Sequence, residues 1–213
     1  IYMRGQARDY DGWRQMGALG WSWADVLPIF QQTEDFHAGA DDVHGAGGEW
    51  RVEEPRLSWE ILDAFREAAI QAGIPATDDF NRGNNEGVGY FHVNQRKGVR
   101  WNASKAFLRP IKNRPNLTVL THAHTERLEI TEGRATAVLF TKGEGGGAKP
   151  KRAEVTGEAI LAAGAVGSPH LLQLSGIGSG AHLQSIGLDT VADVPNVGQN
   201  LQDHLQVRLA YKV

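Results

Sequence analysis

Short runs of apolar and β-branched residues alternate with polar, glycine-containing stretches after residue 116. Runs of this length, separated in this way, are typical of strands joined by tight turns. We expect strands at 117–120, 126–130, 135–141 and 151–156, with turns at 131–134 and 143–147. Together these elements would form an antiparallel β-meander over residues 117–158.

A strand-turn-helix unit is predicted next, over residues 159–178. It begins with the apolar residues 159–163, which have no polar position to face water and therefore indicate a strand buried on both faces. Ser168 and Pro169 are residue types preferred at an N-cap and at a first helical position. We expect a helix that packs its leucines inward and ends at Gly176.

Helix signals and loops fill the first half of the chain. Ser22-Trp-Ala-Asp25 is a capping box and predicts the start of a helix. Pro28 conflicts with one continuous helix, so we expect a short turn before it and a second helical piece after it.

A further helix is predicted between Ser58 and Gly73. Ser58 is the expected N-cap, Leu57 and Leu62 are placed as a hydrophobic staple, and the glycine ends the helix. The remaining predicted elements are loops at 41–48 and 78–89, strands at 49–54 and 90–95, and a short helix at 102–108.

The composition is that of a soluble globular protein of 213 residues, with 41% hydrophobic and 22% charged residues. The net charge of −3 supplies no broad basic field, so we expect neither nucleic acid nor an anionic membrane as a partner. The apolar runs are too short to span a bilayer. Without cysteine the chain has no disulfide and no thiolate metal site, and we expect a cytoplasmic location.

The small-residue turn after residue 163 has two interpretations. The N–H groups of a helix that follows a strand in an open sheet favour the pyrophosphate of a dinucleotide. Alternatively, Gly164 and Gly167 only permit a close contact between the strand and the helix. The residues by themselves leave both interpretations open.

A second glycine motif is not expected to bind phosphate. Gly176-Ile-Gly178-Ser-Gly-Ala181 has the G-x-G-x-x-A spacing of a dinucleotide fingerprint. That fingerprint follows a strand and has an acidic residue about 20 positions later. Here the motif follows the predicted helix, and residues 196–201 contain no acid. A nicotinamide-dependent dehydrogenase is therefore not favoured.

Histidines and paired acids are candidates for metal binding or catalysis. His122 and His124 are expected on the same face of a strand, a spacing that can hold zinc, but no third ligand lies near them in the sequence. Asp41-Asp42 and Asp78-Asp79 lie in glycine-rich loops, where solvated charge is a better interpretation than a paired general acid and base. We expect no metal site, and we expect His170 on an exposed helix face.

Several stretches of the sequence resemble one family. Gly164-Ala-Val-Gly-Ser-Pro-His-Leu-Leu-Gln-Leu-Ser-Gly-Ile-Gly178 is similar to the second signature of the glucose-methanol-choline (GMC) oxidoreductases, flavoenzymes that oxidise alcohols. The resemblance covers nearly the whole chain and is strongest to bacterial choline-dehydrogenase-like members. The other matching stretches are Ile1-Tyr-Met-Arg-Gly5, Asp9-Tyr-Asp-Gly-Trp13, Gly20-Trp-Ser-Trp23, Val26-Leu-Pro28, Arg114-Pro-Asn-Leu-Thr-Val-Leu120 and Val197-Gly-Gln-Asn-Leu-Gln-Asp-His204.

The resemblance implies a mixed α/β (α+β) fold and FAD as the cofactor. Part of a Rossmann-like FAD/NAD(P)-binding domain would be interleaved with part of a substrate-binding domain. Residues 1–96 would combine FAD-covering segments with the start of the substrate domain, and residues 97–213 would belong to the FAD-binding domain.

Five cofactor-binding residues are implied by the same resemblance. Ile1 and Tyr2 match the tail of a glycine-rich segment that runs against the flavin. Thr125 would meet the adenine through its backbone. Ala163 and Gly164 would border the adenosine and the pyrophosphate.

The implied reaction is oxidation of a primary alcohol, choline-like or other, to an aldehyde by hydride transfer to flavin N5. The family's catalytic histidine is expected beyond Val213 and its dinucleotide fingerprint upstream of Ile1, so we assign no catalytic residue within the chain. His204 falls in a stretch that is structural in the family.

We therefore expect a central fragment that is inactive alone and that self-associates through exposed strand edges. The alternative is a non-catalytic α/β module that binds a partner through its tryptophan-rich N-terminal part.

Overall fold

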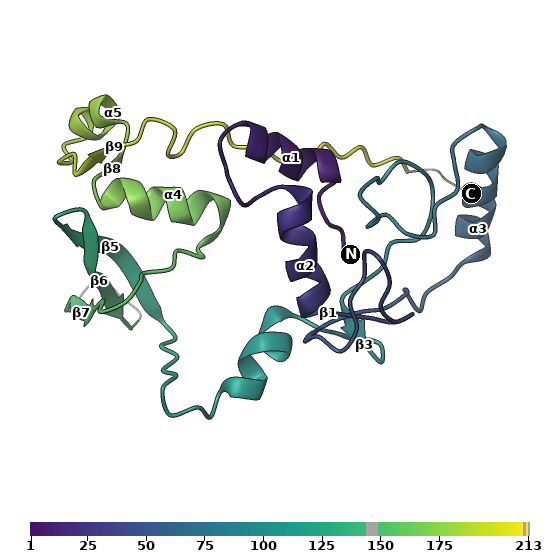
Figure 1. Cartoon of the computed structure of the whole chain (residues 1–213), viewed down its shortest axis with the longest axis horizontal. Helices are drawn as coiled ribbons and strands as arrows, with labels where there is room; N and C mark the ends of the chain where they lie inside the picture. Colours follow the sequence, from purple (N-terminus) through teal and green to yellow (C-terminus); the bar gives the residue numbers. More distant parts are fainter. Residues whose placement is uncertain (144–148, 211, 213) are drawn as a thin grey trace. The chain divides into compact units, whose positions relative to one another are not determined.

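A computed structural model describes residues 1–143, 149–210 and 212 (Figure 1). The chain divides into two compact units, Ile1–Leu117 and Thr118–Val213. Both helices and antiparallel strands are present, which confirms the mixed α/β class. The predicted division into cofactor and substrate domains at residue 96 is a functional one and stays a prediction.

The first unit begins with two helices, α1 (Ala7–Gln15) and α2 (Trp23–Thr33). The capping box is confirmed, because Ser22 N–H donates to the Asp25 carboxylate at 2.9 Å and Asp25 N–H donates to the Ser22 hydroxyl at 3.3 Å. The predicted break at Pro28 is wrong, since α2 runs through it. A proline there removes only one hydrogen bond of the helix, and the remaining turns continue.

Helix α3 (Glu60–Gln71) begins later than predicted. Its N-cap is Trp59 and no side chain caps it, so the assignment of Ser58 as N-cap is wrong. The predicted staple fails with it, because Leu57 is 59% exposed. The acidic side chains Glu60 and Asp63 occupy the first turn, where the helix dipole favours negative charge. The predicted end at Gly73 is confirmed by its positive φ of 92°.

Short strands complete the first unit. The predicted strand at 49–54 is present as β2 (Trp50–Val52), which pairs in parallel with β1 (Glu34–Phe36). The predicted strand at 90–95 is mostly absent, since only a single bridge from Val93 to Glu53 and the hairpin of β3 (Gln95–Arg96) and β4 (Val99–Arg100) form there. The predicted short helix is a π-helical turn, η1 (Ser104–Leu108), followed by a 3₁₀ turn, η2 (Arg109–Ile111).

The second unit contains the predicted meander. Strands β5 (Ala123–Thr131), β6 (Arg134–Lys142) and β7 (Lys151–Glu154) form an antiparallel sheet in that order. Glu132 and Gly133 have φ values of 52° and 77°, as in the tight turn of a two-residue hairpin. The turn predicted at 143–147 lies, apart from its first glycine, outside the described residues.

Two predicted strands of this unit do not form. Residues 117–120 and 159–163 have no strand partner in the described part of the chain, and Ile160 is 85% exposed. Apolarity identifies a segment suited to burial, but a strand also requires neighbouring strands to take up its hydrogen bonds.

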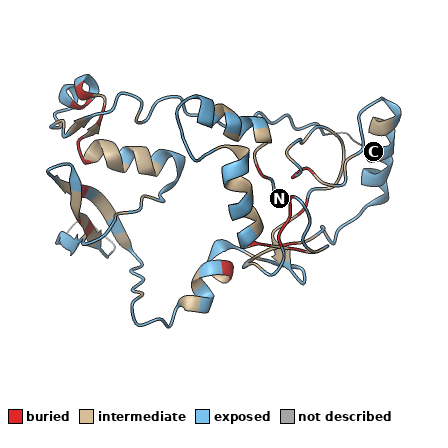
Figure 2. Ribbon diagram, in the orientation of Figure 1, coloured by how far each residue is buried: buried red, intermediate tan, exposed pale blue. Residues whose placement is uncertain are grey.

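Helix α4 (Gly164–Leu174) follows, and then β8 (Ile177–Gly178), α5 (Gly180–Ser185) and β9 (Ala192–Asp193), with β8 and β9 paired in parallel. Buried apolar side chains form a separate core in each unit (Figure 2). These core residues are Phe36, Val43, Val52, Phe80 and Ala106 in the first unit, and Leu128, Ala137, Phe140 and Leu183 in the second.

Candidate functional site

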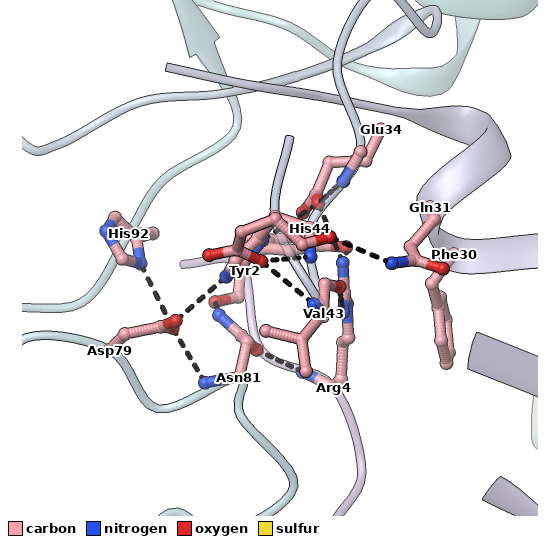
Figure 3. Close-up of polar contacts among 12 residues, drawn as sticks. Tyr2, Arg4, Phe30, Gln31, Glu34, Val43, His44, Asp79, Asn81 and His92 are labelled. Atoms are coloured by element: carbon pink, nitrogen blue, oxygen red, sulfur yellow. Dashed lines mark hydrogen bonds and ion pairs between the residues drawn. The ribbon is translucent and has the colours of Figure 1, made fainter. Parts of the chain in front are cut away.

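Buried charged and polar side chains gather beneath the first residues of the chain (Figure 3). We call Arg4, Glu34, His44, Asp79 and Asn81 the Arg4 network. Four of them are no more than 5% exposed, and the Asp79 side chain is 12% exposed. Groups of this kind are buried only when hydrogen bonds and opposite charges compensate the loss of water.

Glu34 is the anionic centre of the Arg4 network. Its Oε2 accepts hydrogen bonds from His44 Nδ1 and from Gly45 N–H, both at 2.9 Å, and lies 2.8 Å from a guanidinium nitrogen of Arg4. A Cβ on Gly45 would lie 1.7 Å from the carbonyl oxygen of Gln31. Glycine is therefore required where this loop passes α2.

His44 lies between two carboxylates. Its Nε2 is 2.8 Å from Asp79 Oδ2, and the Phe36 ring stacks on the imidazole with the ring centroids 3.8 Å apart. Because carboxylates only accept hydrogen bonds, both ring nitrogens carry protons. Burial by itself lowers the pKa of His44, but the hydrogen bonds to Asp79 and Glu34 outweigh it and raise the pKa to about 9.

Asp79 and Asn81 close the Arg4 network. Burial raises the pKa of Asp79, but the hydrogen bonds from His44 and from Asn81 N–H, the latter at 2.8 Å, lower it to about 2. The amide oxygen of Asn81 then accepts from Arg4 N–H at 2.8 Å. The contacts thus run from the Arg4 side chain through Glu34, His44 and Asp79 back to the Arg4 backbone.

Tyr2 is held by the Arg4 network and by His92. The N–H of Tyr2 donates to the carbonyl of His92 at 2.7 Å, and the carbonyl of Tyr2 accepts from the side-chain amide of Asn81 at 3.3 Å. Its hydroxyl accepts from Arg4 Nε at 3.0 Å, and burial raises the pKa of Tyr2 to about 12. Ile1, by contrast, is 74% exposed.

Sequence reasoning missed most of this network. Arg4, Glu34, His44 and Asn81 received no individual role, and the interpretation of Asp79 as solvated charge is wrong. Its neighbour Asp78 does face water, with a side chain 97% exposed. The one available signal was His44-Gly45, a histidine followed by glycine in an otherwise acidic loop.

The predicted strand-helix site in the second unit has a different local structure from the one expected. Helix α4 begins at Gly164, whose φ is +83°, and not at Pro169. Ser168 is not the N-cap, since it lies within α4. Its hydroxyl accepts a hydrogen bond from the N–H of Ala163, the residue before the helix, at 3.0 Å. The left-handed glycine lets the chain enter the helix five residues early. The exposed position of His170 and the end of the helix at Gly176 are confirmed.

Helix α4 is joined by a side-chain hydrogen bond to the outer edge of β5, where no strand of the described residues pairs. The hydroxyl of Ser175 accepts from Leu128 N–H at 2.8 Å and donates to the carbonyl of Leu171 at 2.6 Å. In Figure 1 the strand and the helix run in the same general direction. Thr125 lies on this edge strand, so backbone groups that do not pair with β6 face away from the sheet.

The backbone around Gly164 is exposed to solvent and has no side chain of the described residues packed over it. A Cβ added to Gly164 would meet no atom within 4 Å, and residues 162–166 are all exposed. Such a helix start has room for a phosphate group and N–H groups to bind it. The other glycine motif has no such room, because Asp193 already accepts from Gly180 N–H at 2.9 Å at the start of α5.

The remaining candidates do not assemble into a site. His122 has a φ of +53° and precedes β5, so the expectation that His122 and His124 share one face of a strand is wrong. In the described ranges, no group of three or more His, Cys, Asp or Glu residues could hold a metal ion. No helix in the described part of the chain is long and apolar enough to cross a membrane.

The sequence profile described as GMC oxidoreductase matches residues 1–206. The chain belongs to the GMC oxidoreductase family. Members of this family bind FAD, so the predicted family and cofactor class are both confirmed.

Curated relatives of this GMC chain include oxygen-dependent choline dehydrogenases. That of Sinorhizobium fredii is 40% identical over 206 residues, and that of Brucella ovis is 42% identical over 207 residues. In both comparisons the match covers 97% of this chain and 37% of the relative. The GMC chain thus spans little more than a third of the length of these relatives.

Solved structures share its fold. Pyridoxine 4-oxidase from Mesorbium loti superposes with a TM-score of 0.83 at 32% identity, over 92% of this chain and 38% of that one. An FAD-dependent oxidoreductase from Chaetomium thermophilum gives a TM-score of 0.88 at 30% identity, over 95% of this chain and 37% of that one. The predicted flavoprotein fold is therefore confirmed. The five predicted cofactor-binding residues stay predictions.

Proposed function

We propose that this chain is the central part of an FAD-dependent enzyme that oxidises a primary alcohol to an aldehyde. The observation that carries the proposal is membership of the GMC family over residues 1–206. The choline dehydrogenases among the relatives favour a choline-like alcohol as substrate. When bound, FAD would supply the acceptor for the hydride of the alcohol, at flavin N5.

The residues of the second unit would hold the adenosine and pyrophosphate end of FAD. Gly164 supplies the bare backbone at the start of α4, and Ala163 precedes it. Thr125 offers backbone groups on the edge strand β5. The open space at Gly164 and the absence, among the described residues, of a neighbouring strand at Thr125 on the outer edge of β5 fit a nucleotide bound by backbone atoms.

The residues of the first unit would lie against the flavin. Tyr2 is held by His92 and Asn81 through its backbone, and Ile1 beside it presents an exposed side chain. This arrangement fits a fixed surface on which a planar ring system rests. We expect the base that removes the alcohol proton to come from another part of the whole protein.

The test is anaerobic reduction of the flavin in the full-length protein. Purified with FAD, the protein should show a flavin absorption spectrum that bleaches when choline or another primary alcohol is added. An analogue of the alcohol that lacks the hydroxyl group serves as the control and should leave the spectrum unchanged. A protein without flavin would favour the partner-binding module, and a flavin that no alcohol in a broad panel reduces would contradict the proposed reaction.

A further inference from the structure

The Arg4 network surrounds a short segment of the chain, residues 2–4, rather than a pocket (Figure 3). Arg4 is held through its backbone N–H by Asn81 and through its guanidinium group by Glu34, while the carbonyl of Val43 accepts a further hydrogen bond from it at 2.6 Å. One residue is thus fixed at both its main chain and its side chain. The segment can neither slide nor rotate without breaking buried contacts.

From this geometry we propose that His44, Asp79 and Asn81 are positioning residues that hold Ile1 and Tyr2 in register against the flavin. The proposal rests on the proposed function, because the flavin contact of Ile1 and Tyr2 belongs to it. It assigns to three residues outside the predicted cofactor site a role in the alcohol oxidation. They act through Arg4 and Tyr2, without touching the cofactor.

The composition of the Arg4 network supports positioning over simple stabilisation. Buried ion pairs contribute little net stability, because desolvation offsets most of their attraction, and apolar residues of similar volume often stabilise as well. Directional hydrogen bonds do restrict geometry in a way that apolar contacts do not. Hydrogen bonds of this kind fix Tyr2 and Arg4 to Asn81, which lies 79 and 77 positions away, respectively.

The charges of the Arg4 network balance. Arg4 and the doubly protonated His44 are cations, and Glu34 and Asp79 are anions. Arg82 closes the solvent side with its Nε 3.2 Å from Asp79, and it pairs with Asp41 and Asp42. His92, whose Nδ1 is 3.7 Å from Asp79 Oδ1, has a pKa lowered by burial and stays neutral near pH 7. The segment is thus anchored by a set of groups that needs no external counter-ion.

The test uses Asn81→Ala in the full-length protein with FAD bound. This change removes the contacts to Arg4 and Tyr2 but leaves the Arg4–Glu34 and His44–Asp79 ion pairs in place, so folding should survive. His44→Leu is the more disruptive second variant. His182→Gln changes an exposed histidine of the other unit and is the matched control.

Three readouts separate positioning from general stability. Hydrogen exchange of the peptide that contains residues 2–4 should be roughly tenfold faster in Asn81→Ala, because the Arg4 N–H loses its buried hydrogen bond. The visible circular dichroism of the flavin should change, and the FAD dissociation constant should rise by up to about tenfold. His182→Gln should match the wild type in all three.

Faster exchange with an unchanged flavin signal and unchanged FAD affinity would overturn the proposal, because the segment would then be held for another purpose. Unchanged exchange would overturn it as well, since Asn81 would not restrain the segment. A wild-type protein without FAD would instead refute the proposed function, and with it the role assigned to these three residues.

Discussion

At the scale of single residues, His44 stands out because a carboxylate faces each of its buried ring nitrogens. Loss of its proton would leave one nitrogen lone pair pointing at a carboxylate oxygen. Protonation of His44 and the fold of residues 34–45 are therefore linked.

This linkage predicts a loss of stability in mild alkali. His44 has a folded pKa of about 9, above its ordinary value of 6.5. Its contribution to stability is therefore complete below pH 6.5 and is lost as the pH rises through 9. The loss should be on the order of 3 kcal/mol. Thermal unfolding of the full-length protein between pH 6 and 10 measures it.

The variant His44→Gln provides the comparison. It cannot carry a proton, so its midpoint temperature should start lower and should not show the additional decline between pH 6.5 and 9. Parallel declines for the wild type and His44→Gln would contradict the linkage. Asp79 acts in the opposite range, because a depressed pKa contributes stability that is lost only as the pH falls towards 2.

Single residues also show what the sequence could and could not predict. The capping box at Ser22 and Asp25 was predictable, because both partners lie within one turn. The role of Asp79 was not, because its partner His44 is 35 positions away and the neighbouring Asp78 has the same residue type in water. Local patterns carry no information about which of two adjacent acids turns inward.

At the scale of elements, the junction of α4 and β5 depends on one hydroxyl group. Ser175 is buried and caps Leu128 N–H on the free edge of β5. Ser175→Ala would leave this buried N–H without a partner, which costs about 1–3 kcal/mol. We expect a lower unfolding temperature and faster hydrogen exchange at Leu128.

Ser185→Ala is the matched control for this change. Ser185 is exposed and donates only to the carbonyl of His182 at the end of α5. Its removal should alter stability by less than about 0.5 kcal/mol. Equal effects of the two substitutions would show that the hydroxyl of Ser175 does not fasten the helix.

Elements were predictable where their signals are local. The hairpin of β5 and β6 follows from a glycine turn between two apolar runs, and it forms as expected. The strand at 159–163 has an equally clear apolar pattern but no partner in the described residues. The N-terminus of α4 was misplaced because Ser168-Pro169 imitates a helix start, whereas the left-handed Gly164 begins the helix earlier.

At the scale of the whole molecule, large apolar side chains remain in contact with water in both units. Trp21 is 53% exposed, Phe65 61% and Ile160 85%. A chain that spans 37% of the length of its relatives would leave such surfaces uncovered. Strand β7 is a weaker candidate for association, because Lys151, Arg152 and Glu154 place charges along its edge.

This exposure predicts that the 213-residue chain self-associates when it is produced alone. Apolar patches of this kind associate in water because their contact removes hydrophobic surface. Sedimentation velocity over a hundredfold range of concentration should show oligomers that grow with concentration. The full-length protein under the same conditions should sediment as a species of fixed size. A monomeric chain at every concentration would contradict the prediction.

The Arg4 network also limits when this part of the protein can become ordered during synthesis. Arg4 and Asn81 are separated by 77 positions, and no contact between them exists until the ribosome has released the later residue. Contacts of such high sequence separation are slow to form because a long loop must close first. The side chain of Arg4 can meet Glu34 and Val43 earlier, but its backbone N–H gains its partner only after almost eighty further residues have been translated.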